Sequence, residues 1–166
     1  MSGVPGLDPS YRELVEWAYN GEMFGVLFLD VLLRADSHPE HRDSLTLLRE
    51  LEAATMHRLA AHIGEDLDPS EDLVAAATDF ARDVASMTWQ QFMDATVAIA
   101  HEALPHFELL VRRAPPAAAH DMAAVLDHER SLLAFADGDE PKDASTLTPH
   151  LDRYPAEPSP PTKDHR

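Results

Sequence analysis

Apolar residues recur at spacings of three and four along four long segments of the chain, and this spacing is typical of amphipathic helices. The segments cover about residues 11–34, 39–63, 89–113 and 117–136, and a shorter helical pattern covers about residues 71–86. No run of alternating apolar and polar residues predicts a strand. We therefore expect an all-α fold with four main helices, joined by short turns, and one extra short helix.

Residues that favour helix ends mark where these segments begin and stop. Asp8 or Ser10 is expected to cap the first helix, and Thr88 the third long one, because their side-chain oxygens accept hydrogen bonds from free backbone N–H groups. Gly64 is expected to end the second helix. Pro105 lies inside the third long segment. We expect it to kink or break that helix, because proline lacks an N–H and its ring clashes with the preceding turn.

Proline content separates a helical domain from the end of the chain. We expect three parts: an N-terminal arm at residues 1–9, a helical bundle at residues 10–137 and a C-terminal extension at residues 138–166. The extension holds six of the thirteen prolines. It is expected to contain an ordered piece around Leu147 and Leu151 and to be disordered from about Pro155.

Three polar residues interrupt the apolar faces of different helices. Glu22 lies in the middle of the stripe of the first helix, Glu52 in the middle of the stripe of the second, and His128 takes an interior position on the last. Because burial of an unpaired carboxylate costs several kcal/mol, these side chains are expected to share a partner. A divalent metal fits this role, since carboxylate oxygens and imidazole nitrogens suit iron, manganese or zinc.

The identity of a fourth group in this site stays open. One face of the third long helix carries His101, and another carries Glu102 and His106, but the proline in that helix obscures which face points inward. Each of these three residues is therefore a candidate ligand. Glu129, next to the interior histidine of the last helix, is a further candidate, as a ligand or as a group that orients the ligands.

Simpler interpretations of these residues also stay open. A single glutamate on a helix face often extends its carboxylate into water, and a single buried histidine is more often a hydrogen-bonded core residue than a ligand. Two glycines, Gly21 and Gly25, flank Glu22 and favour a site. Each costs about 1 kcal/mol relative to alanine inside a helix. Such glycines permit close helix approach or leave space for a ligand.

The charge of the chain argues against several classes of partner. It has 30 acidic residues against 13 lysines and arginines, for a formal net charge of −17. We therefore expect no binding to nucleic acid or to anionic membranes. The chain has no cysteine, which excludes disulfides and thiolate metal sites. No apolar run reaches the length of a membrane span, and the first residues do not resemble a secretory signal, so a cytoplasmic location is expected.

Three short segments resemble bacterial proteins of the ferritin-like superfamily. They are residues 19–24 (Tyr-Asn-Gly-Glu-Met-Phe), residues 51–52 (Leu-Glu) and residues 127–132 (Asp-His-Glu-Arg-Ser-Leu), within a resemblance that covers about residues 10–137. Such proteins are four-helix bundles, and they hold a di-iron or di-manganese centre with one Glu on each of two helices and Glu-x-x-His on the other two. The resemblance implies iron storage, peroxide reduction or oxygen-dependent oxidation of an organic substrate.

The match to the ferritin-like ligand set is incomplete. Glu22 corresponds to the lone Glu of the first helix and Glu52 to the Glu of the second-helix motif, but Thr55 stands where that motif has His. His128 corresponds to the His of the last helix, and Val125 stands where that motif has Glu. A single-metal site and a bundle that has lost its metal are therefore both compatible with the resemblance.

Three functions follow from these observations. The first is a ferritin-like, iron- or manganese-dependent oxidoreductase or oxygenase that acts on a small molecule, with Glu22, Glu52 and His128 at its site. The second is a metal-free enzyme or ligand-binding protein of small-molecule biosynthesis, in which the same residues act as acid, base or hydrogen-bond anchors. The third is a non-enzymatic helical interaction protein. We expect a homodimer in each case.

Overall fold

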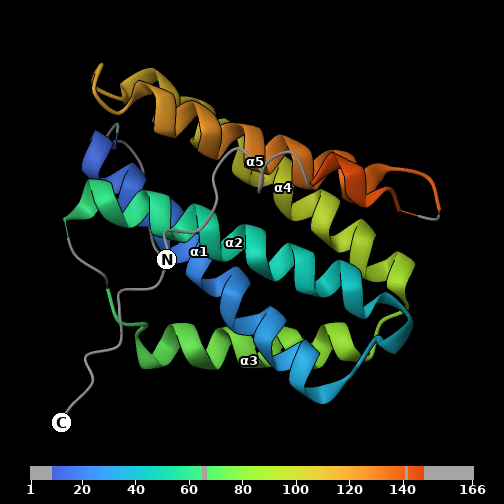
Figure 1. Ribbon diagram of the computed structural model, residues 1–166. Helices are drawn as coiled ribbons and strands as arrows, with labels where there is room; N and C mark the ends of the chain where they lie inside the picture. The colour runs from blue at the N-terminus through green and yellow to red at the C-terminus, as the bar shows by residue number, and fades with distance from the viewer. Residues whose placement is uncertain (1–8, 65–66, 141, 148–166) are drawn as a thin grey trace, which may run out of the picture.

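A computed structural model describes residues 9–64, 67–140 and 142–147. Over these residues the chain forms helices and no strand, which confirms the expected all-α fold (Figure 1). The α-helices are α1 (Tyr11–Ala35), α2 (Arg42–Ile63), α3 (Glu71–Ala85), α4 (Trp89–Arg113) and α5 (Ala119–Asp137), and the 3₁₀ turns are η1 (Pro39–His41) and η2 (Ala144–Thr146). The predictions for the N-terminal arm before residue 9, for Leu151 and for the tail from Pro155 lie outside this part of the chain.

The helix ends follow the expected chemistry. Ser10 caps α1, since its hydroxyl accepts a hydrogen bond from the N–H of Glu13, whose carboxylate accepts one from the N–H of Ser10. Thr88 and Gln91 form the same reciprocal pair at the start of α4. Gly64 ends α2 with a φ of 89°, a backbone conformation that glycine adopts without strain.

The helices pack around α1. This helix contacts α2, α3 and α4, while α5 contacts α4 and α2. Four long helices therefore adjoin one another in the order α1, α2, α5, α4, and α3 lies outside that group, against α1 (Figure 1). None of the helices in the described part of the chain combines the length and hydropathy that a membrane crossing requires.

The apolar core is divided into two clusters along the helix axes. The first cluster contains Leu14, Val15, Ala18, Tyr19 and Met23 of α1 together with Leu59, Ala60 and Ile63 of α2. The second contains Leu29 and Leu32 of α1 together with the N-terminal half of α2. A polar layer lies between the two clusters, because α1, α2 and α5 each place a charged side chain at this level. The candidate site is that layer.

Part of the C-terminal extension covers one end of the molecule. The side chain of Leu147 is fully buried in the second apolar cluster. The Nζ of Lys142 donates hydrogen bonds to the carbonyl oxygens of Ala136 and Gly138, at 2.7 and 2.6 Å, and so satisfies acceptors at the end of α5. The expected ordered segment of the extension is therefore present as far as Leu147.

The expectation that Pro105 breaks the third long helix is wrong. Helix α4 is continuous over 25 residues, and Pro105 lies inside it with an exposed side chain. On this face the backbone carbonyl that loses its N–H partner is close to solvent, so water can replace the missing donor. The buried face of α4 comprises Trp89, Phe92, Met93, Ala100, Phe107 and Leu110.

Candidate metal centre

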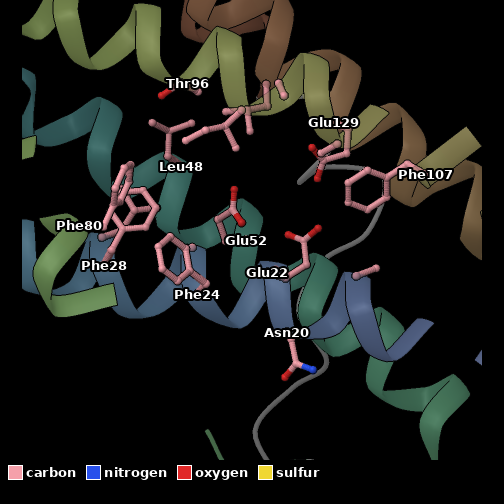
Figure 2. Close-up of a pocket in the computed structure, with 18 of the residues that line it drawn as sticks. Asn20, Glu22, Phe24, Phe28, Leu48, Glu52, Phe80, Thr96, Phe107 and Glu129 are labelled. Carbon is pink, nitrogen blue, oxygen red and sulfur yellow. The ribbon is translucent and has the colours of Figure 1, made fainter. Parts of the chain in front are cut away.

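The polar layer contains three carboxylates and one imidazole. Helix α1 supplies Glu22, α2 supplies Glu52, and α5 supplies both His128 and Glu129. The Nε2 of His128 lies 3.5 Å from Oε2 of Glu22, 3.6 Å from Oε1 of Glu52 and 3.7 Å from Oε1 of Glu129. Figure 2 shows the three carboxylates pointing toward one another from their different helices.

Glu22 is the most deeply buried of the carboxylates. Only 2% of its surface is exposed, and neither of its oxygens has a hydrogen-bond partner within the described residues. Burial, and then the nearby charges of Glu52 and Glu129, raise the pKa of Glu22 well above its ordinary value of 4.5. A buried carboxylate without a partner destabilises the folded chain, so this position requires either a proton or a cation.

The two charged residues of α5 are also perturbed. Burial raises the pKa of Glu129 to about 7, with His128 opposing this change and Glu52 adding to it. Burial by itself lowers the pKa of His128, but the carboxylates of Glu52 and Glu129 outweigh it and raise that pKa above its ordinary value of 6.5. The layer therefore holds more protons near neutral pH than its separate groups would hold in water.

The structure brings together the three residues on which the sequence prediction rests. One potential ligand atom from each of Glu22, Glu52 and His128 lies within 4.8 Å of the others. This buried group can hold a metal ion, because two carboxylates and an imidazole converge from three rigid helices. Glu129 also faces Nε2 of His128, the atom that Glu22 and Glu52 approach, so both roles expected for it, ligand and orienting group, stay predictions.

The structure does not support the candidate ligands from the third long helix. His101, Glu102 and His106 are all exposed on α4, and none of them belongs to the buried group. Helix α4 instead turns Ala100 and Phe107 toward the interior. The sequence pattern failed here because alanine adds little to a hydrophobic stripe, so the inward face of α4 was not recognisable.

The two positions where the sequence departs from the ferritin-like motifs are both buried. Thr55 is 2% exposed and Val125 is fully buried. Neither supplies an imidazole or a carboxylate, so the layer contains a single histidine within the described residues. The geometry therefore fits one metal ion better than two.

Gly25 makes room for the second carboxylate. A Cβ at this position would lie 2.7 Å from Cδ and 3.0 Å from Cγ of Glu52, which is closer than carbon atoms pack. At Gly21, one turn earlier, a Cβ would meet nothing within 4 Å. The sequence predicted that these glycines permit a close approach or leave space for a ligand. Gly25 permits the close approach of the Glu52 side chain, and Gly21 lies beside open space.

Gly25→Ala is expected to weaken metal binding without weakening the helix. Alanine favours a helix interior by about 1 kcal/mol over glycine, but its methyl group must displace the Glu52 carboxylate. We expect at least a roughly 10-fold lower affinity for Mn(II), measured by calorimetric titration. Gly21→Ala is the matched control, since it gives the same helix gain with no clash. Equal affinities in the two variants would contradict the role of Gly25.

An apolar cavity of about 330 Å³ adjoins the polar layer. Glu22, Glu52 and Glu129 form part of its wall, and aromatic side chains from α1, α3 and α4 form much of the remainder (Figure 2). The contribution of α3 to this wall, through Phe80, was not predicted from the sequence. The amphipathic pattern of residues 71–86 could have indicated this contribution, because no other helix had been predicted to cover their apolar face.

Buried acids, an imidazole and an adjoining cavity together can bind a cation, exchange protons and hold an apolar ligand. Acidic ligands alone would suit magnesium or calcium, but the imidazole shifts the preference toward transition metals. Searches of the whole chain against protein-family models, curated proteins and solved structures give no match.

Proposed function

We propose that the protein is a metal-dependent oxidoreductase or oxygenase that acts on a small molecule. In this proposal α1, α2, α4 and α5 form a ferritin-like four-helix bundle, and α3 is the additional short helix. Iron or manganese is held by Glu22, Glu52 and His128. The observation that carries the proposal is the buried carboxylate of Glu22, which faces these two groups without a hydrogen-bond partner in the described residues.

The residues of the layer fit a divalent cation. Two positive charges offset the mutual repulsion of the carboxylates, which otherwise raises the pKa of Glu22. Oxygen and imidazole ligands together suit iron and manganese. When bound, such a metal supplies the electron-transfer chemistry with dioxygen or peroxide that protein side chains lack.

The chain itself contributes ligands, a proton site and an apolar environment. Glu22, Glu52 and His128 would bind the metal through Oε and Nε2 atoms. In the metal-free chain burial raises the pKa of Glu129 to about 7, so its carboxyl group can exchange a proton beside His128 near neutral pH. The aromatic side chains of the cavity wall give these groups a largely apolar environment.

Dioxygen consumption tests this function. Metal-free protein would be loaded with Fe(II) without air, exposed to dioxygen and followed with an oxygen electrode. We expect faster consumption than Fe(II) gives in buffer, and its loss in His128→Ala. His101→Ala is the matched control, because His101 is exposed on α4. Equal consumption by the two variants would contradict the proposal.

A metal-free acid–base enzyme or ligand-binding protein is the second candidate. The raised pKa values of Glu22 and Glu129 favour it, because they keep protonated carboxyl groups available near neutral pH at the wall of an apolar cavity. It differs from the first candidate in one respect that can be measured: its activity would survive treatment with a chelator. A homodimer and a partner-binding role of the acidic surface stay predictions.

A further inference from the structure

The cavity beside the polar layer has a wall of aromatic rings. Phe24 and Phe28 come from α1, Phe80 from α3 and Phe92 from α4. The rings of Phe28 and Phe80 meet edge to face at 5.0 Å and 85°, and those of Phe28 and Phe92 at 6.2 Å and 90°. Figure 2 shows Phe24, Phe28 and Phe80 gathered at one side of the cavity, away from Phe107. Such tilted rings offer both faces and edges to a flat ligand.

The ionisable groups on the cavity wall are all carboxyl groups. Among the described residues that line it, the ionisable side chains are Glu22, Glu52 and Glu129, and no lysine, arginine or histidine is present. An anionic ligand would therefore enter an apolar space without a cation from the protein to pair with.

The cavity opens to solvent between α1 and α4. Gly21 and Ile99 both line it and are both exposed, with 51% of the Ile99 surface accessible. A Cβ at position 21 would meet no atom within 4 Å, so the space beside this glycine is open. Because α3 packs on α1, its Phe80 closes one side of the cavity without closing this opening.

We propose that the cavity binds an uncharged, largely apolar aromatic molecule, which enters past Gly21 and places its reacting end at Glu22 and Glu52. Unpartnered Glu22 oxygens at one end and phenylalanine rings at the other define the two ends of this ligand. A volume of about 330 Å³ is near the lower limit for small-molecule sites, so the ligand is small. The inference rests on the proposed function for the reaction, although the binding itself can be tested without metal.

A pair of probes with the same ring system and different charge tests the charge preference. Binding of 2-naphthol and of 2-naphthoate to the full chain, without metal and at neutral pH, would be followed by calorimetry. We expect 2-naphthol to bind at least about 10-fold more tightly, because the carboxylate of 2-naphthoate would be buried in an apolar cavity whose wall offers no cation to pair with it. Equal binding of the two probes, or no binding of 2-naphthol, would overturn the proposal.

Substitutions at Gly21 test where the ligand enters. Gly21→Phe places a ring in the opening and should reduce 2-naphthol affinity at least about 10-fold, whereas Gly21→Ala should leave it unchanged. Circular dichroism would verify that both variants keep their helices. If Gly21→Phe binds 2-naphthol as well as wild type does, this opening is not the route.

Mn(II) titration of the same proteins separates this inference from the proposed function. We expect both Gly21 variants to bind Mn(II) as wild type does, because the ligand atoms lie deeper in the layer. Binding of 2-naphthol by a wild-type protein that binds no Mn(II) would refute the metal-dependent function and leave the aromatic site standing. Mn(II) binding without 2-naphthol binding would refute the aromatic site and leave the metal-dependent function standing.

Discussion

Glu22→Gln is expected to abolish metal binding while it stabilises the metal-free protein. Glutamine keeps the shape of the side chain but removes a ligand charge, so affinity for Mn(II) should fall by more than about 100-fold. Without metal, the buried glutamate must take up a proton or remain charged beside Glu52 and Glu129. An amide avoids both and can donate hydrogen bonds to those carboxylates, which should add about 2 kcal/mol to the free energy of unfolding.

These two opposite effects distinguish a ligand from a structural residue. Urea unfolding of the metal-free proteins and calorimetric titration with Mn(II) would measure them. Glu102→Gln is the matched control, because Glu102 is exposed on α4 and outside the layer, and we expect neither quantity to change. A Glu22→Gln protein that is less stable than wild type without metal, or that still binds Mn(II) normally, would contradict this assignment.

Raising the pH is expected to destabilise the metal-free protein and to strengthen metal binding. The pKa values of Glu22, Glu129 and His128 are all raised in the folded chain, so protons favour folding at these groups. Their contribution is fully present below the ordinary pKa values and is lost as the pH rises through the raised ones. For Glu129 the change from 4.5 to about 7 corresponds to about 3 kcal/mol.

Urea unfolding between about pH 5 and about pH 8 measures this effect, and the range avoids acid denaturation. Asp121 would act in the opposite sense at lower pH, because the hydrogen bonds from His62 and Arg58 outweigh burial and lower its pKa below 3.8. Metal ions compete with protons for the same atoms, so Mn(II) affinity should rise over this range. A metal-free protein that grows more stable from pH 5 to pH 8 would show that the layer does not titrate as described.

The sequence allowed the polar layer to be predicted where the apolar stripes are regular. On α1 the other buried positions carry no charged side chain, so a glutamate among them was conspicuous. His128 stood out on α5 for the same reason, since Val125 and Leu126 precede it. The rule that buried charges need partners then grouped residues that lie far apart in the sequence.

The rest of the site depends on tertiary packing that a single sequence does not reveal. The inward face of α4 is built partly from alanine, and Pro105 suggested a break that solvent exposure makes unnecessary. The cavity depends on the packing of α3 against α1, which places Phe80 in its wall. Packing partners of an amphipathic helix are not encoded in its own periodicity.

The most direct test of the metal centre is the metal content of the purified protein. Elemental analysis of wild type and of Glu22→Gln, after loading with Fe(II) or Mn(II) and removal of excess metal, measures it. The convergence of Glu22, Glu52 and His128 predicts about one metal ion per wild-type chain and none in the variant. A wild-type chain that retains no metal, or a variant that retains as much as wild type, would contradict it.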